Sequence, residues 1–128
     1  MRIEHIAIWS DDIDRLKRFY ELYFSARAND KYTNHSKGFS SYFLEFESGC
    51  RLEVMQMPGI EFLPDRDKQY HGIAHLAVSV GSRSAVDSLT ERIRGDGYAV
   101  VGEPRTTGDG YYESVVLDPD GNRIEITI

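Results

Sequence analysis

The chain has 128 residues, enough for one ordinary domain with a buried core. Its 41% hydrophobic and 28% charged residues are typical of a soluble globular protein, and no apolar run approaches the roughly 20 residues of a membrane span. The net charge of −6 argues against a polyphosphate-binding surface, so we expect no nucleic acid and no membrane as partners. One cysteine, Cys50, and an N-terminus without a secretory apolar segment predict a cytoplasmic protein.

The first half of the chain predicts a strand, a helix and three further strands. Residues 2–9 alternate between two faces, which is the period of a strand. Ser10, Asp11 and Asp12 supply an N-cap and an acidic first turn for an amphipathic helix. The expected elements are a strand over 2–9, a helix over 11–23, a weaker strand within 25–33, and strands over 39–46 and 50–56.

The second half predicts the same order of elements after a connector. Pro58, Pro64 and a run of charged residues mark this connector, which divides the single domain 1–128 into module 1 (about 1–57), a linker (about 58–71) and module 2 (about 72–128). Ser82 is the expected N-cap of the second helix and Gly95 its left-handed C-terminal cap. The expected elements are a strand over 72–80, a helix over 83–94, a short strand over 98–102, and strands over 111–117 and 122–128.

The two halves also repeat a pair of side chains. His5 is followed 48 residues later by Glu53, and His75 is followed 50 residues later by Glu125. Each glutamate closes a similar phrase, Gly-Cys-Arg-Leu-Glu in the first half and Gly-Asn-Arg-Ile-Glu in the second. Such internal similarity indicates a duplicated supersecondary unit.

The four repeated residues are expected on the sheet faces away from the helices. In each strand their immediate neighbours are apolar, and alternation then directs the His and Glu side chains to the opposite face. Two imidazoles and two carboxylates suit a divalent transition metal. Taken singly, a histidine near a strand start or a glutamate on a half-buried strand is usually structural or solvated, and duplication alone could preserve all four.

Three motifs resemble the vicinal oxygen chelate superfamily, the group of glyoxalase I, extradiol dioxygenases and bleomycin-binding proteins. They are the opening Glu-His-Ile-Ala at 4–7, the run Gly-Ile-Ala-His-Leu-Ala-Val at 72–78, and the closing Leu-Asp-Pro-Asp-Gly-Asn-Arg-Ile-Glu at 117–125. The resemblance covers the whole chain. It implies an α+β fold of two tandem βαβββ modules, whose curved mixed sheets surround a metal held by His5, Glu53, His75 and Glu125.

The second ligand position favours the glyoxalase I branch. Epimerases of the superfamily typically carry glutamine there and dioxygenases usually no carboxylate ligand, whereas this chain has Glu53. The resemblance implies a metal-dependent lyase or isomerase, similar to lactoylglutathione lyase, that moves a proton through a metal-bound enediolate. Glu125 is the implied base and Glu53 its near-symmetric counterpart. The substrate would be a hemithioacetal of a 2-oxoaldehyde and a thiol, and no organic cofactor is required.

The chain departs from this branch where glutathione is usually held. Trp9 stands where an arginine usually contacts the glutathione carboxylate, and Met57 stands where an asparagine is usual. These two differences disfavour glutathione as the thiol part of the substrate. Trp9, Arg105 and Tyr111 are candidate substrate contacts, with a packing aromatic, a solvated surface charge and an ordinary hairpin connection as the respective plain alternatives.

The sequence is also compatible with other functions, with several metals and with two arrangements of the metal site. A bleomycin-type binding or resistance protein is the alternative function, and an extradiol dioxygenase is disfavoured because Glu53 would fill a coordination position. The donor set accepts Ni²⁺, Zn²⁺, Co²⁺, Mn²⁺ or Fe²⁺, at one ion per site. The resemblance to short bacterial glyoxalases implies Ni²⁺ first, and cellular abundance makes Zn²⁺ the other leading candidate. The resemblance implies a homodimer whose metal sites combine modules of one subunit or of two.

Overall fold

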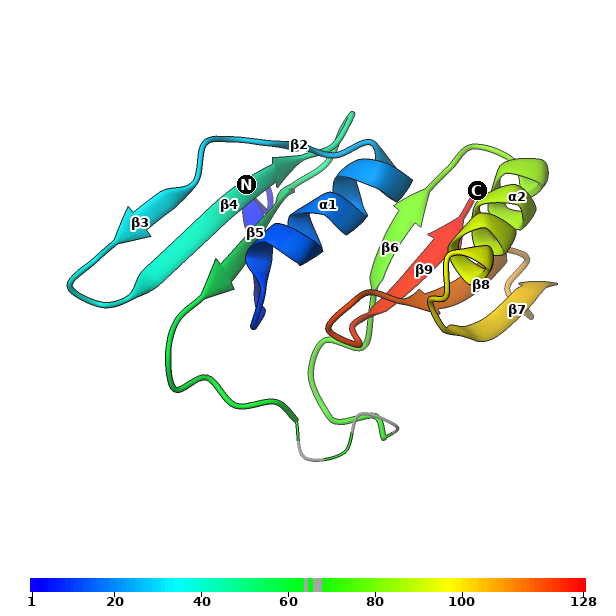
Figure 1. Ribbon diagram of the computed structural model, residues 1–128. Helices are drawn as coiled ribbons and strands as arrows, with labels where there is room; N and C mark the ends of the chain where they lie inside the picture. Colours follow the sequence, from blue (N-terminus) through cyan, green and yellow to red (C-terminus); the bar gives the residue numbers. More distant parts are fainter. Residues whose placement is uncertain (64, 66–67) are drawn as a thin grey trace. The chain divides into compact units, whose positions relative to one another are not determined.

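The computed structural model describes residues 1–63, 65 and 68–128 (Figure 1). These residues form two compact units, Met1–Pro64 and Asp65–Ile128. Each unit has one helix against one mixed sheet, so the predicted α+β class with two βαβββ modules is confirmed. No helix in the described part of the chain has the length and apolar character that crossing a membrane requires.

The first unit places a helix on one face of a five-stranded sheet, with strand order β1-β5-β4-β2 and β3 beside β4. β1 and β5 run parallel, and β4 runs antiparallel to its neighbours. The predicted weak strand is two short ones. The elements are β1 (His5–Trp9), α1 (Ile13–Phe24), β2 (Arg27–Ala28), β3 (Tyr32–Asn34), β4 (Phe39–Glu45) and β5 (Arg51–Gln56).

The amphipathic pattern of α1 determines which face of the first sheet is covered. Asp12 caps the helix by accepting a hydrogen bond from the backbone N–H of Arg15 at 2.8 Å. The buried side of α1 packs on the sheet residues at even positions of β5, Leu52 and Val54, which are 3% and 0% exposed. Because side chains alternate along a strand, Glu53 points to the uncovered face.

The second unit repeats this arrangement with four strands in the order β6-β9-β8-β7. β6 and β9 run parallel, whereas β8 is antiparallel to both of its neighbours. β7 is longer than the sequence predicted and shows register shifts along β8. The elements are β6 (Leu76–Ser79), α2 (Arg83–Gly95), β7 (Val100–Thr106), β8 (Tyr112–Leu117) and β9 (Arg123–Thr127).

Helix α2 begins as predicted but ends differently. Ser82 is its N-cap and accepts a hydrogen bond from the N–H of Ala85 at 3.2 Å. Gly95, the expected left-handed cap, is the last helical residue, and the left-handed residue is Gly97 at φ +91°. The N–H groups of Gly97 and Tyr98 bond to carbonyls of the last turn, those of Arg94 and Ile93, which is the pattern of a Schellman cap. The prediction for Gly95 was therefore wrong by two residues.

The turn between β8 and β9 follows the predicted Asp-Pro-Asp-Gly signal. The Asp118 carboxylate accepts hydrogen bonds from the backbone N–H groups of Asp120 and Asn122 at 2.9 and 2.8 Å. It also accepts one from the side-chain amide of Asn122 at 2.9 Å. Gly121 adopts φ +84°, a conformation that favours glycine. This turn determines where β9 begins, and it thereby determines the position of Glu125 along the strand.

Candidate metal centre and adjoining pocket

The first unit brings His5 and Glu53 together on its uncovered sheet face. In the parallel β1–β5 pair, His5 is opposite Arg51, and Ala7 is opposite Glu53. The two ligand candidates are therefore diagonal neighbours, and Nε2 of His5 lies 3.9 Å from Oε2 of Glu53. Glu53 is mostly buried, with 15% of its side chain exposed, while His5 is 40% exposed.

Neighbouring side chains orient His5. Its Nδ1 lies 2.5 Å from Oε2 of Glu4. Hydrogen bonds from His5 and then from Arg51 hold the pKa of Glu4 below its usual range. An ionised carboxylate can only accept, so Nδ1 carries the proton, and Nε2 is the nitrogen that faces Glu53. The Phe43 ring meets the imidazole edge-on at 5.4 Å and lies beneath the Arg51 guanidinium at 4.2 Å.

The second unit brings His75 and Glu125 together in the same way. Ala77 is opposite Glu125 in the parallel β6–β9 pair, and His75 directly precedes β6. Nε2 of His75 lies 3.5 Å from Oε2 of Glu125. Glu125 is 17% exposed and His75 is 45% exposed, close to the values of the first pair. The duplicated sequence thus yields two His–Glu pairs of the same register.

The surroundings of the second pair differ from those of the first. Ala74 occupies the position of Glu4, so the residue before His75 offers no carboxylate. Glu113 lies on the same sheet face as Glu125, one diagonal step away between β8 and β9. Burial, followed by the charge of Glu125, raises the pKa of the Glu113 carboxyl, while Arg105 at 3.9 Å opposes this. The second pair is therefore flanked by a carboxyl that retains its proton more readily.

Each pair fits a divalent metal ion by donor chemistry and by spacing. Bonds from Zn²⁺ to imidazole nitrogen and carboxylate oxygen are about 2.0–2.2 Å, so one ion can touch two donors up to about 4.2 Å apart. The separations of 3.9 and 3.5 Å meet that condition. Within either unit, the described His, Cys, Asp and Glu residues form no metal-binding group of three or more. Each unit thus supplies two donors.

The predicted substrate contacts occupy different settings. Trp9, at the end of β1, is on the same strand face as His5 and is 40% exposed. Arg105 is in β7, is 69% exposed, and approaches Glu113. Tyr111 is 56% exposed in the turn between β7 and β8, where its backbone N–H and carbonyl bond to Thr107.

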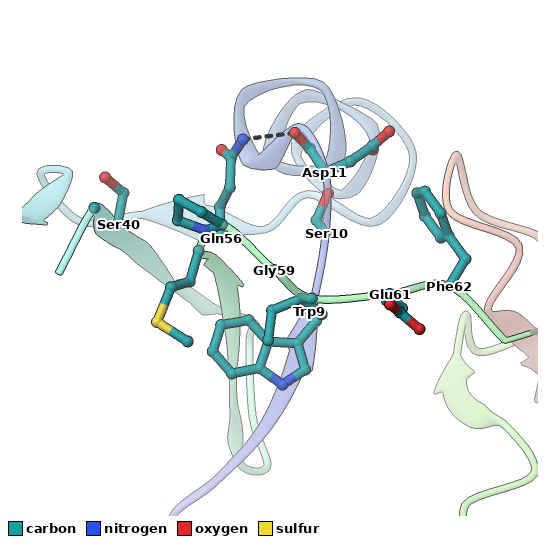
Figure 2. A pocket seen from close by; sticks show the side chains of 12 residues that line it. Trp9, Ser10, Asp11, Ser40, Gln56, Gly59, Glu61 and Phe62 are labelled. Carbon is teal, nitrogen blue, oxygen red and sulfur yellow. Dashed lines mark hydrogen bonds between the residues drawn. The ribbon is translucent and has the colours of Figure 1, made fainter.

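Trp9 lines a pocket of about 550 Å³ in the first unit (Figure 2). The pocket lies where β1 and β5 end and the segment after β5 begins. Gln56 closes one side, since its amide donates a 2.6 Å hydrogen bond to the carbonyl of Asp11. The lining residues are Trp9, Ser10, Asp11, Gly38, Ser40, Gln56, Met57, Pro58, Gly59, Ile60, Glu61 and Phe62.

Sequence reasoning missed three residues of these sites. Glu4 precedes a ligand candidate, and a carboxylate adjacent to a histidine was the available signal. The sequence held no signal for Glu113 or Phe62. The pairing register of β8 and β9 places Glu113 beside Glu125, and the path of the chain after β5 places Phe62 in the pocket.

Nearly the whole chain matches the model of one protein family. The model of the Glyoxalase/Bleomycin resistance protein/Dioxygenase superfamily matches residues 2–126. Among curated proteins, the uncharacterised protein YqjT of Bacillus subtilis (strain 168) is 27% identical over 127 residues, which cover 97% of this chain and 96% of YqjT.

Solved structures with the same fold include two glyoxalase I enzymes. The trypanothione-dependent glyoxalase I of Leishmania major is 24% identical with a TM-score of 0.78, over 99% of this chain and 86% of that one. Glyoxalase I from Zea mays is 22% identical with a TM-score of 0.79, over 98% of this chain. The chain spans 44% of the maize protein's length. At these identities the likeness shows a shared fold.

Proposed function

The chain belongs to the Glyoxalase/Bleomycin resistance protein/Dioxygenase superfamily, and from that premise we propose that it is a metal-dependent lyase or isomerase of glyoxalase type. The observation that carries this proposal is the pair of equivalent His–Glu contacts, 3.9 Å in the first unit and 3.5 Å in the second. A four-ligand site needs one pair from each unit, supplied by one subunit or by two subunits of a homodimer.

The donor set supports isomerisation chemistry. A divalent ion held by His5, Glu53, His75 and Glu125 supplies Lewis acidity that makes the proton on the carbon next to a carbonyl easier to remove. Two neutral imidazoles and two carboxylates balance its charge. Ni²⁺ or Zn²⁺ are the first candidates, and Co²⁺, Mn²⁺ and Fe²⁺ also suit these donors.

Glu125 is the proposed general base. Its carboxylate takes a proton from one carbon of the substrate and returns it to the adjacent carbon. Glu125 has the Glu113 carboxyl one diagonal step away on the same sheet face, whereas the corresponding position beside Glu53 is occupied by Ser41. This difference supports Glu125 for proton transfer and Glu53 as the counterpart that holds the ion.

The proposed substrate is a hemithioacetal of a 2-oxoaldehyde and a thiol, converted into a 2-hydroxyacyl thioester. Glutathione is disfavoured as the thiol because Trp9 and Met57 offer no cation or amide to its carboxylates. The pocket beside Trp9 also supports the alternative of a small-molecule binding protein. An extradiol dioxygenase is less favoured, because Glu53 occupies a position that such an enzyme keeps free of a carboxylate.

Metal analysis followed by an activity screen tests the proposal. We expect about one divalent ion per chain, and turnover of methylglyoxal with at least one thiol. His5→Ala with His75→Ala should abolish metal retention, whereas His35→Ala with His71→Ala should preserve it as a control of matched residue type. Full metal retention by the first double variant would contradict the proposal. Tight ligand binding by metal-free protein without turnover would favour the binding-protein alternative.

A further inference from the structure

The pocket beside Trp9 has a charge pattern that the proposed chemistry does not use. Asp11 and Glu61 are its two ionisable lining residues, and both are acidic. The Asp11 carboxylate already pairs with Arg15 at 2.7 Å. Glu61 is exposed and forms no ion pair with the residues that the structure describes. The pocket therefore has an uncompensated negative charge at one side.

The remaining lining combines aromatic and apolar side chains with the polar Ser10, Ser40 and Gln56. The aromatic residues Trp9 and Phe62 are 40% and 53% exposed, and Ile60 is 40% exposed. Figure 2 shows Glu61 and Phe62 on the segment that passes Trp9. Aromatic faces attract organic cations, and apolar surface favours burial of an alkyl or aryl body.

Two backbone N–H groups at the start of helix α1 are already used within the chain. Free N–H groups at a helix N-terminus would attract an anion. Here the N–H of Asp12 donates to Oγ of Ser10 at 3.0 Å, and the N–H of Arg15 donates to Asp12 at 2.8 Å. These two N–H groups are satisfied within the chain, and the carboxylate of Asp11, which lines the pocket, disfavours an anion.

We propose that this pocket binds the end of the substrate remote from the metal, and that this end is an apolar group carrying a positive charge, an alkyl- or arylalkylammonium. The proposal rests on the proposed function for its assignment to the substrate. Trp9 is four residues from His5 on the same face of β1, which corresponds to about 13 Å at the rise of a strand. The substrate must span roughly that length.

The fluorescence of Trp9 tests pocket binding directly, because it is the chain's one tryptophan. Chelator-treated protein is titrated with benzylammonium, benzyl alcohol and benzoate, which share a ring and differ in charge. We expect benzylammonium to bind roughly threefold to tenfold more tightly than benzyl alcohol, and benzoate to bind weakest. Equal or tighter binding of benzyl alcohol or benzoate would overturn the proposal.

Two variants test whether the charge of Glu61, and not the shape of the pocket, causes the preference for benzylammonium. Glu61→Gln should remove the advantage of benzylammonium over benzyl alcohol and leave benzyl alcohol binding unchanged. Glu47→Gln, an exposed carboxylate outside the pocket, should preserve the advantage. The same result for both variants would overturn the role of Glu61.

A competition experiment tests the assignment to the substrate. With metal-loaded protein and a methylglyoxal–thiol adduct that is turned over, benzylammonium should raise KM and leave kcat unchanged. Absence of competition would overturn the assignment. Failure of metal to bind at the His–Glu pairs would instead contradict the proposed function, and the order of ligand affinities would be unaffected.

Discussion

Nδ1 of His5 donates a 2.5 Å hydrogen bond to the Glu4 carboxylate, which leaves Nε2 free to face Glu53. A carboxylate in this position fixes both the tautomer and the ring orientation of a metal-binding histidine. Ala74 occupies the equivalent position in the second unit, so His75 lacks this support. The duplicated halves have thus diverged in how firmly each histidine is held.

Removal of the Glu4 carboxylate should weaken metal binding. For Glu4→Ala we expect affinity for Zn²⁺ or Ni²⁺ to fall about 10- to 100-fold, because His5 loses its fixed tautomer. Calorimetric titration measures the affinity, and the ¹⁵N chemical shifts of His5 report the tautomer. Glu47→Gln should change neither. Unchanged affinity together with a changed tautomer would show that Glu4 does not position His5 for metal.

The two glutamates of the pairs should differ in catalysis. We expect Glu125→Gln to lower kcat by about 10²- to 10⁴-fold, the range for loss of a general base, with most of the metal retained. Glu53→Gln should mainly lower metal content, and added metal should restore part of its activity. Elemental analysis beside steady-state kinetics distinguishes the two. If metal-saturated Glu53→Gln lost more kcat than Glu125→Gln, Glu53 would be the general base and Glu125 the residue that mainly holds the metal.

Glu113 predicts a pH dependence of stability in metal-free protein. Its pKa is raised, so the folded state holds this proton more tightly than the unfolded chain does. Unfolding then releases a proton between the ordinary and the raised pKa, and stability falls as pH rises through that window.

Glu113→Gln should flatten that fall and stabilise metal-free protein at neutral pH. Repulsion between like charges across strands is worth roughly 0.2–1 kcal/mol, which sets the expected gain. Urea denaturation of chelator-treated protein at several pH values measures it, and Glu45→Gln on the exposed end of β4 is the control. A larger loss of stability at high pH in Glu113→Gln would disprove the assignment.

The Asp118 carboxylate should be essential to the turn before β9. It accepts three hydrogen bonds and is 4% exposed, so Asp118→Ala leaves buried N–H groups without partners. We expect the free energy of unfolding to fall by about 1–3 kcal/mol. Asp30→Ala, at an exposed position, should change it by less than about 0.5 kcal/mol. Equal effects in a denaturant titration would contradict this role.

The end of helix α2 offers a matched pair of glycine substitutions. Gly97→Ala places a side chain at φ +91° and should cost about 1–2 kcal/mol. Gly95→Ala is at a helical position with open space around the added methyl group, and it should be neutral or stabilise by up to about 1 kcal/mol. Thermal unfolding of both variants compares them, and the reverse order would be inconsistent with the observed cap.

The sequence alone determined the fold class and the order of the helices and longer strands in both modules, but it did not separate the weak strand predicted within 25–33 into β2 and β3. Alternation in β1 and β5 and helical spacing in α1 are local properties, so the faces of His5 and Glu53 could be predicted before any strand was paired. The family motifs are also local, and they anticipated the superfamily. Gly95 was assigned incorrectly because a helix end depends on which residue reaches the left-handed region, and Gly95 and Gly97 were both available.

Only the tertiary structure decided which side chains become neighbours, because no local pattern in the sequence encodes those contacts. The register of β8 against β9 places Glu113 beside Glu125, and a shift of one residue would have moved it to the opposite face. The path after β5 returns Glu61 and Phe62 to Trp9 and forms the pocket. Alternation tells which face a side chain occupies, whereas its neighbours depend on contacts between segments that are distant in the chain.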